Sequence, residues 1–260
     1  MNTAIKYQID INCDLGEGIE TASVSNDEAI MPFISSCNIA CGFHAGSPEL
    51  MRHSVDLAMQ HAVAIGAHPS YNDRENFGRK YLNISKAQLQ DELCFQIHQL
   101  QGIVEQAGAV LHHVKPHGAL YNAAAVDLEL ANCIATSIAL VDKNLIFYGL
   151  ANSKMAVAAR QHNLAFAHEA FIDRAYQANG QLLPRSEPSA VITDPAVVLP
   201  RALQIITRAS VISVDGAEIS LDCDTLCLHG DSPGTTKVAQ MLAEFLTENQ
   251  VDIKAVAFRE

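Results

Sequence analysis

The chain has 260 residues, and 17 Lys and Arg against 29 Asp and Glu give a formal net charge of −12. Hydrophobic residues make up 49% and charged residues 18%, which excludes intrinsic disorder, and the acidic balance argues against a binder of nucleic acid or anionic membrane. No segment approaches about 18 consecutive apolar residues, and the start, MNTAIKYQID, lacks the apolar core of a signal peptide. Seven cysteines, an odd number, indicate reduced thiols in a cytoplasmic protein.

Short apolar runs alternate along the chain with segments that carry helix signals. The runs predict strands at 7–14, 36–42, 62–70, 110–118, 145–151, 164–171 and 224–231. Ser47-Pro48 predicts a helix start, and Ser85 with Gln88 forms a capping-box pattern for a helix that runs to Gln106. Further helices are expected at 127–141, 153–162, 195–210 and 235–248. Seven strand–helix units in one domain, 1–260, favour an α/β barrel with parallel strands over an open sheet.

Side chains alternate between two faces along each predicted strand. In the first run, Asp14 ends a polar row that lies opposite the apolar Ile9, Ile11 and Cys13. In a β/α barrel the apolar row faces the helices, and polar residues at the carboxyl ends of several strands build the active site. The side chains expected to converge at this mouth are Asp14, His44, His68, Lys115, His117, Glu169, His229 and Asp231.

Each of these residues has a structural alternative. A single histidine near a strand end more often makes a structural hydrogen bond, but four of them at four strand ends favour a functional site. Lys115 can bind an anion, have a lowered pKa, or extend past apolar neighbours to water. Asp14 is a candidate for catalysis and Glu17 for binding substrate or phosphate, and the alternative for both is that they cap the turn after the first strand. Six further histidines are interpreted as structural: His53, His61, His98, His112, His162 and His168.

Two glycine-rich turns follow the first and last predicted strands. In residues 14–18 (DLGEG), glycines allow backbone amides to approach a ligand. Residues 229–236 (HGDSPGTT) open a helix, so Gly230, Asp231 and Gly234 are candidates for binding substrate or phosphate, with a plain helix cap as the alternative. The sequence contains no P-loop, no G-x-S-x-G and no H-E-x-x-H, which removes common nucleotide, serine-hydrolase and zinc-protease signatures.

Two C-x₃-C pairs, Cys37/Cys41 and Cys223/Cys227, suggest zinc at first sight. Both pairs lie in strand-like apolar runs, where this spacing places the two thiols on one face but too far apart to share one ion. Structural packing is therefore the favoured interpretation.

Six long stretches resemble the LamB/YcsF family, the A subunits of bacterial ATP-dependent 5-oxoprolinase. They are DINCDLGEG (10–18), SCNIACGFHAG (36–46), GAHPSYNDRENFGR (66–79), HVKPHGALYN (113–122), EAFIDRAYQANGQLLPR (169–185) and LHGDSPG (228–234). The resemblance implies an irregular seven-stranded β/α barrel related to carbohydrate deacetylases. It also implies cleavage of 5-oxo-L-proline to L-glutamate coupled to ATP hydrolysis, together with partner subunits B and C.

The reaction that this resemblance implies requires a base for water, cations for anionic groups and an acid for the leaving nitrogen. The expected base is Asp14 or His117, with Lys115 and Arg174 as anion partners. His44, His68 and His229 are expected to contact a phosphorylated intermediate or to hold a divalent metal, for which Asp14, His44 and His68 are the candidate ligands. One alternative is a metal-dependent amidohydrolase or deacetylase acting alone, and another is a non-catalytic subunit that binds substrate or regulates its partners.

Overall fold

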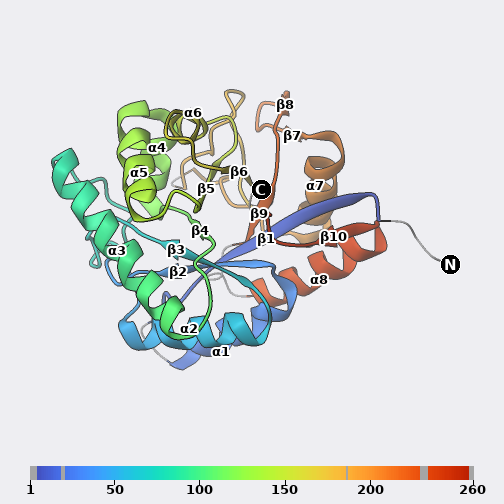
Figure 1. Ribbon diagram of the computed structural model, residues 1–260. Coiled ribbons are helices and arrows are strands. Elements are labelled where there is room, and N and C mark those ends of the chain that lie inside the picture. The colour runs from blue at the N-terminus through green and yellow to red at the C-terminus, as the bar shows by residue number, and fades with distance from the viewer. Residues whose placement is uncertain (1–4, 19–20, 186, 229–233, 258–260) are drawn as a thin grey trace.

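A closed barrel of seven parallel strands forms the centre of the computed structural model, which describes residues 5–18, 21–185, 187–228 and 234–257. The barrel closes because β1 pairs with β2 on one side and with β9 on the other (Figure 1). A further parallel strand, β10 (Val251–Ile253), pairs with the start of β1. The barrel strands are β1 (Tyr7–Leu15), β2 (Ser36–Ala40), β3 (Ala64–His68), β4 (His113–Val114), β5 (Ile146–Leu150), β6 (Phe166–Phe171) and β9 (Thr225–Leu228). The expected seven-stranded α/β barrel is confirmed.

Helices surround this barrel, and the two caps expected from the sequence, Ser47 and Ser85, are both present. Ser47 and Ser85 each accept a hydrogen bond from a backbone amide of the first turn that follows, and Asp127 does the same. The helices are α1 (Thr21–Ile30), the short 3₁₀ helix η1 (Met31–Phe33), α2 (Pro48–Gln60), α3 (Lys86–Gln106), α4 (Gly118–Val126), α5 (Leu128–Val141), α6 (Lys154–Gln161), α7 (Pro195–Arg208) and α8 (Thr235–Glu248). The sequence analysis missed α1 and α4, as well as the antiparallel hairpin of β7 (Ser210–Ile212) and β8 (Glu218–Ser220).

The alternation predicted for the first strand is confirmed in β1. Ile9, Ile11 and Cys13 are buried in the apolar layer of the core. The opposite row is polar and buried: Asp10 accepts hydrogen bonds from Ser36 (2.8 Å) and from Thr225 (2.7 Å). The lumen is therefore filled by a hydrogen-bonded polar network, which satisfies its buried groups.

The last described residues cover the amino end of the barrel. The backbone amide of Lys254 donates to the carbonyl oxygen of Ile9 (2.9 Å), and His112 Nε2 donates to the carbonyl oxygen of Val256 (2.8 Å). The Val256 side chain packs against a small cluster that includes Tyr148. With its amino end covered in this way, the barrel offers its carboxyl end to ligands.

All seven cysteines are free thiols, as expected. Cys37 and Cys41 are fully buried in the apolar layer, which agrees with a packing role. Among the described residues, no single helix has the length and apolar character needed to span a membrane; the pair α4–α5 meets those criteria together but is bent by 119°.

Candidate active site

A cavity of about 480 Å³ lies at the carboxyl end of the barrel strands. Six of the predicted site residues line it: Asp14, Glu17, His68, Lys115, His117 and Arg174. His44 and Glu169 are buried beside these residues, in contact with Glu17 and Lys115 respectively. The convergence expected from strand parity is thus present for most of the set.

The remaining predicted residues belong to the turn after β9. His229, Gly230 and Asp231 lie outside the described residues. Gly234 occupies the N-cap position of α8 with a left-handed backbone (φ 87°), and its exposed position is outside the cavity lining.

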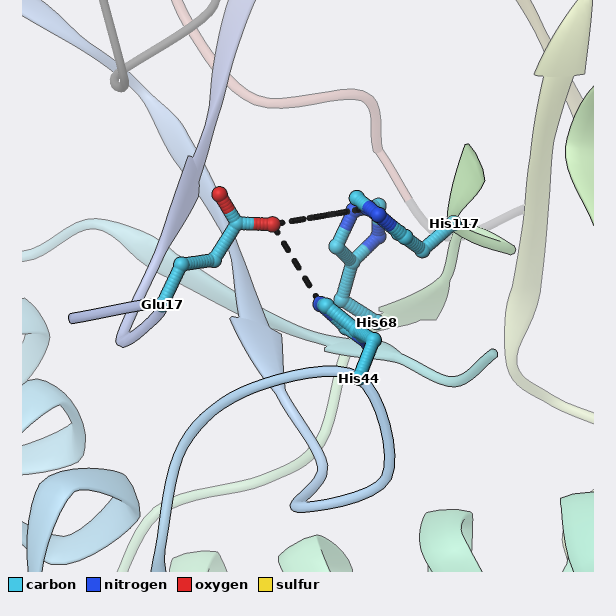
Figure 2. A group of neighbouring side chains, drawn as sticks. All are labelled: Glu17, His44, His68 and His117. Carbon is cyan, nitrogen blue, oxygen red and sulfur yellow. Dashed lines mark hydrogen bonds and ion pairs between the residues drawn. The ribbon is translucent and has the colours of Figure 1, made fainter. Parts of the chain in front are cut away.

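Glu17, His44, His68 and His117 form a compact group of donor atoms at the cavity floor (Figure 2). The four atoms that they contribute lie within 4.8 Å of one another. Oε1 of Glu17 lies 3.3 Å from Nε2 of His44 and 3.4 Å from Nδ1 of His117, as the dashed lines in Figure 2 indicate. The ligands of a tetrahedral metal ion with bonds near 2.1 Å are about 3.4 Å apart, so these separations match a metal site.

Hydrogen bonds on the outer side fix the protonation of two of these imidazoles. Nδ1 of His68 lies 2.7 Å from the carbonyl oxygen of Lys115, and Nε2 of His117 lies 2.9 Å from that of Phe77. A carbonyl oxygen only accepts, so each of these nitrogens carries the proton and the inner nitrogen of each neutral ring is bare. The two inner nitrogens nevertheless face each other at 3.0 Å.

The position of the proton on His44 is fixed in the same way, here by the hydroxyl group of Ser70. Ser70 Oγ donates to the carbonyl oxygen of Tyr71 (2.9 Å), so it accepts from Nδ1 of His44 at 2.8 Å. Nε2 of His44 is then bare and faces Glu17. Three imidazole lone pairs and a carboxylate therefore point at one another, an arrangement that a cation between them would stabilise.

Burial decides which kind of cation suits the group. Burial, together with the neighbouring imidazoles, lowers the pKa of His44 and of His117 well below the ordinary value for histidine. Neutral imidazoles are poor sites for an extra proton and good ligands for a divalent metal. The geometry therefore fits a metal. Its donor set shares His44 and His68 with the expected trio but adds Glu17 and His117, and Asp14 lies beside it.

Lys115 lies immediately below the group of Glu17 and the three histidines. The hydrogen bonds of its ammonium nitrogen are all made to protein atoms. Its Nζ lies 3.0 Å from Oδ1 of Asp14, 2.8 Å from Oε1 of Glu169 and 3.0 Å from Oδ1 of Asn12. Although burial alone would lower its pKa, attraction by Asp14, the Cys227 thiol (3.1 Å) and Glu169 raises it well above the ordinary value. The pKa of Lys115 is therefore raised, and not lowered as considered from the sequence, which favours the charged ammonium form inside the barrel.

Glu169 is held as tightly as Lys115, its ion-pair partner. It is fully buried, and Tyr121 donates a hydrogen bond of 2.6 Å to its Oε2 while Oε1 faces Lys115. Both carboxylate oxygens are therefore engaged inside the protein. This geometry suits a residue that positions Lys115 better than one that exchanges protons with substrate.

Asp14 connects the lysine to the histidine group. Its Oδ1 lies 2.8 Å from Nδ2 of Asn38 and 3.0 Å from Lys115, whereas its Oδ2 lies 3.3 Å from Nε2 of His68. With Oδ1 held from below, Oδ2 is directed toward the histidines and the cavity. Asp14 is therefore placed to accept a proton from a water molecule that attacks a bound substrate.

Sequence reasoning missed Tyr121 and Gly78 as parts of the site. Tyr121 lies on α4, which was not predicted. Gly78 has φ +62°, and a Cβ there would lie 2.9 Å from Cβ of His44 and 3.0 Å from Cδ2 of His117. Gly78 lies in segment 66–79, one of the stretches that resemble the family, and glycine is the residue that allows close packing beneath the histidines. Its place in that segment was the signal by which the sequence could have pointed to it.

Comparison with known proteins places the chain in a family. The LamB/YcsF family model matches residues 9–260. A protein from Bordetella parapertussis, named as the A subunit of 5-oxoprolinase, is 45% identical over 247 residues, covering 95% of this chain and 98% of the relative. The structure of a lactam utilization protein from Thermus thermophilus superimposes with a TM-score of 0.90 at 39% identity, over 96% of this chain and all of that one. A family 4 carbohydrate esterase from Streptomyces lividans gives a TM-score of 0.48 at 12% identity, over 98% of this chain and 95% of the esterase. The chain belongs to the LamB/YcsF family.

Proposed function

We propose that this chain is the A subunit of a cytoplasmic 5-oxoprolinase, which opens the lactam of 5-oxo-L-proline to L-glutamate. ATP is the co-substrate and is hydrolysed to ADP and phosphate, and partner subunits B and C complete the enzyme. The observation that carries this proposal is the match, over nearly the full length of both chains, to relatives named as the A subunit of 5-oxoprolinase. The cavity supports it, since a small polar ring fits within about 480 Å³ beside Asp14 and the histidines.

The chemistry of a lactam explains the need for ATP. An amide carbonyl is a weak electrophile, and transfer of a phosphoryl group to its oxygen creates a better electrophile and a leaving group. Water then attacks the carbon, the C–N bond of the ring breaks, and the nitrogen receives a proton, which leaves an acyl phosphate. A second water molecule hydrolyses this acyl phosphate and releases phosphate together with glutamate. Asp14 Oδ2 accepts the proton of the attacking water, and Lys115 keeps the Asp14 carboxylate ionised and oriented.

Glu17, His44, His68 and His117 would hold a divalent metal, since their inner atoms are all acceptors within 4.8 Å. Such an ion would supply Lewis acidity toward a carbonyl or phosphoryl oxygen. Tyr121 and Glu169 keep Lys115 in place from the opposite side.

The test measures glutamate release and ATP hydrolysis with 5-oxoproline, first with this chain alone and then with its B and C partners. We expect both products in equal amounts, and only from the mixture. A mixture that leaves 5-oxoproline intact would contradict the proposal. Full turnover in a mixture in which this chain carries Asp14→Asn would instead assign the chain to binding or regulation.

The cluster of Glu17 and the three histidines favours a second candidate, a metal-dependent amidohydrolase or deacetylase that acts alone. This candidate predicts hydrolysis of acetamido sugars or simple amides by the isolated chain, without ATP and with sensitivity to a chelator. Incubating the metal-loaded chain with such substrates separates the two functions, because the oxoprolinase requires both ATP and its partners.

A further inference from the structure

Lys115 cannot receive an anionic group of a substrate, although it is the cation nearest the cavity floor. Asp14, Glu169 and Asn12 lie within 3.0 Å of its ammonium nitrogen, and they occupy its hydrogen-bonding capacity. A substrate carboxylate at that position would also meet Asp14. The anion partner must therefore be sought elsewhere on the cavity wall.

The segment between β6 and α7 contributes two arginines to that wall, Arg174 and Arg185. Arg174 is buried, and its guanidinium is fixed by two backbone carbonyl oxygens: Nε donates to Ala190 (3.2 Å) and Nη2 donates to Leu183 (2.7 Å). Within the described part of the chain, Nη1 of Arg174 has no hydrogen-bond partner. One edge of a rigid guanidinium is thus left for a ligand in the cavity.

Arg185 lies on the same wall and is exposed. Among the described residues, its side chain makes no hydrogen bond and no ion pair. Burial lowers the pKa of Arg174, and the charge of Arg185 lowers it further against a smaller opposing effect of Asp173. Two guanidinium groups close enough to repel each other across a cavity wall are the arrangement that an anion stabilises.

The wall that carries these arginines contains apolar as well as polar side chains. Leu150, Phe171, Leu182 and Leu183 line the same cavity as the arginines and as the carboxylate and imidazole groups of the floor. A ligand that carries an anionic group at one end and a small, weakly polar ring at the other matches this distribution.

We propose that Arg174 and Arg185 form a carboxylate-binding subsite that selects cyclic amides bearing a carboxylate substituent. This inference rests on the proposed function and names its specificity determinant. Arg174 supplies a fixed donor edge, and Arg185 closes on the carboxylate from the exposed side. The lactam ring is thereby directed toward Asp14 and the histidines.

The test compares 5-oxo-L-proline with 2-pyrrolidinone, the same lactam without the carboxylate. In the assembled enzyme, Arg185→Gln should raise KM for 5-oxoproline about 10- to 100-fold with little change in kcat, the effect expected when a charged hydrogen bond is lost from binding alone. Arg185→Lys keeps the charge and should recover part of the loss. Arg160→Gln, an exposed arginine on α6 outside this cavity, is the matched control and should change nothing.

Calorimetry on the isolated chain separates the inference from the proposed function. The wild-type chain should bind 5-oxoproline at least about 10-fold more tightly than 2-pyrrolidinone, and Arg185→Gln should remove that preference. Equal binding of the two lactams, no binding of either, or an unchanged preference in Arg185→Gln would overturn the inference. If the preference is present but the assembled enzyme releases no glutamate, the proposed function fails and the carboxylate subsite stands.

Discussion

The ammonium nitrogen of Lys115 lies 2.8 Å from Oε1 of Glu169 and 3.0 Å from Oδ1 of Asp14, so one buried cation pairs with two carboxylates. Because Lys115 is shared, removing a carboxylate and removing the lysine do not cost the same stability. Removal of Glu169 leaves the pair of Lys115 and Asp14 intact. Removal of Lys115 leaves two negative charges close together inside the barrel, which is the costlier defect.

Lys115→Met should therefore lower the free energy of unfolding by about 3–5 kcal/mol, the usual cost of leaving a buried charge unpaired. Glu169→Gln keeps the shape and an acceptor for Tyr121, and should cost only about 1–2 kcal/mol. Urea denaturation at pH 7 measures both. A Lys115→Met protein as stable as the wild type would show that the ammonium contributes no net stabilisation.

His117→Ala should abolish turnover while the barrel stays folded. The change removes one of the four inner donor atoms and leaves the strands untouched, since His117 precedes α4 and makes no side-chain cap for it. Bound metal after dialysis, measured by mass spectrometry, should fall from about one ion per chain. His98→Ala on α3, away from the cavity, is the control, and near-normal activity of His117→Ala would remove this residue from the site.

Gly78→Ala should reduce activity strongly, because its Cβ would lie 2.9 Å from Cβ of His44 and displace the donor group. Gly108→Ala is a matched control: it has the same kind of left-handed backbone (φ +82°), yet a Cβ there meets nothing within 4 Å. Both variants should lose about 1 kcal/mol of stability from backbone strain. Activity and bound metal should fall in Gly78→Ala alone, and equal activity in the two variants would contradict this account.

Stability should depend on pH through Asp27, whose carboxylate accepts a hydrogen bond from the backbone amide of Gly16 (2.8 Å). Burial raises the pKa of Asp27 from 3.8 to about 6, despite that hydrogen bond. The folded state therefore holds this proton more tightly than the unfolded state, so the stabilisation is complete below pH 3.8 and is lost as the pH rises through about 6.

Asp27→Asn isolates this effect, because the amide keeps an acceptor for Gly16 and does not titrate. The stability of the wild type relative to Asp27→Asn should decline from about pH 4 toward about pH 6 and then level off. Urea denaturation of both proteins across this range gives the difference. A difference that is constant with pH would show that Asp27 has an ordinary pKa in the folded state.

Part of the site follows from strand parity and part does not. Asp14 and His68 lie on regular strands, where the alternation of side chains determines which of them face the lumen. β2 ends at Ala40 and β4 contains two residues, so His44 and His117 reach the site from irregular backbone. Their arrival at the predicted place depends on hydrogen bonds to Ser70 and Phe77, which strand periodicity does not encode.

The missed helix α4 has a physical explanation. Its sequence, GALYNAAAV, is apolar on almost every side, begins after His117 without a side-chain cap, and has a glycine at its first position. Start signals and amphipathic periodicity are both absent from such a segment. Tyr121, which supports Glu169, was missed with it.

The pairing of β1 with β2, β9 and β10 has a consequence for how the protein is made. β1 is synthesised before β9 and β10, so it finds two of its three partners only after residues 225–253 have been synthesised. Until then its edge is open to pairing with other chains. A chain that stops before β9 would retain Asp14, His44, His68, His117 and Lys115 but lack the strand that joins β1 to β6, so the barrel around them would stay open.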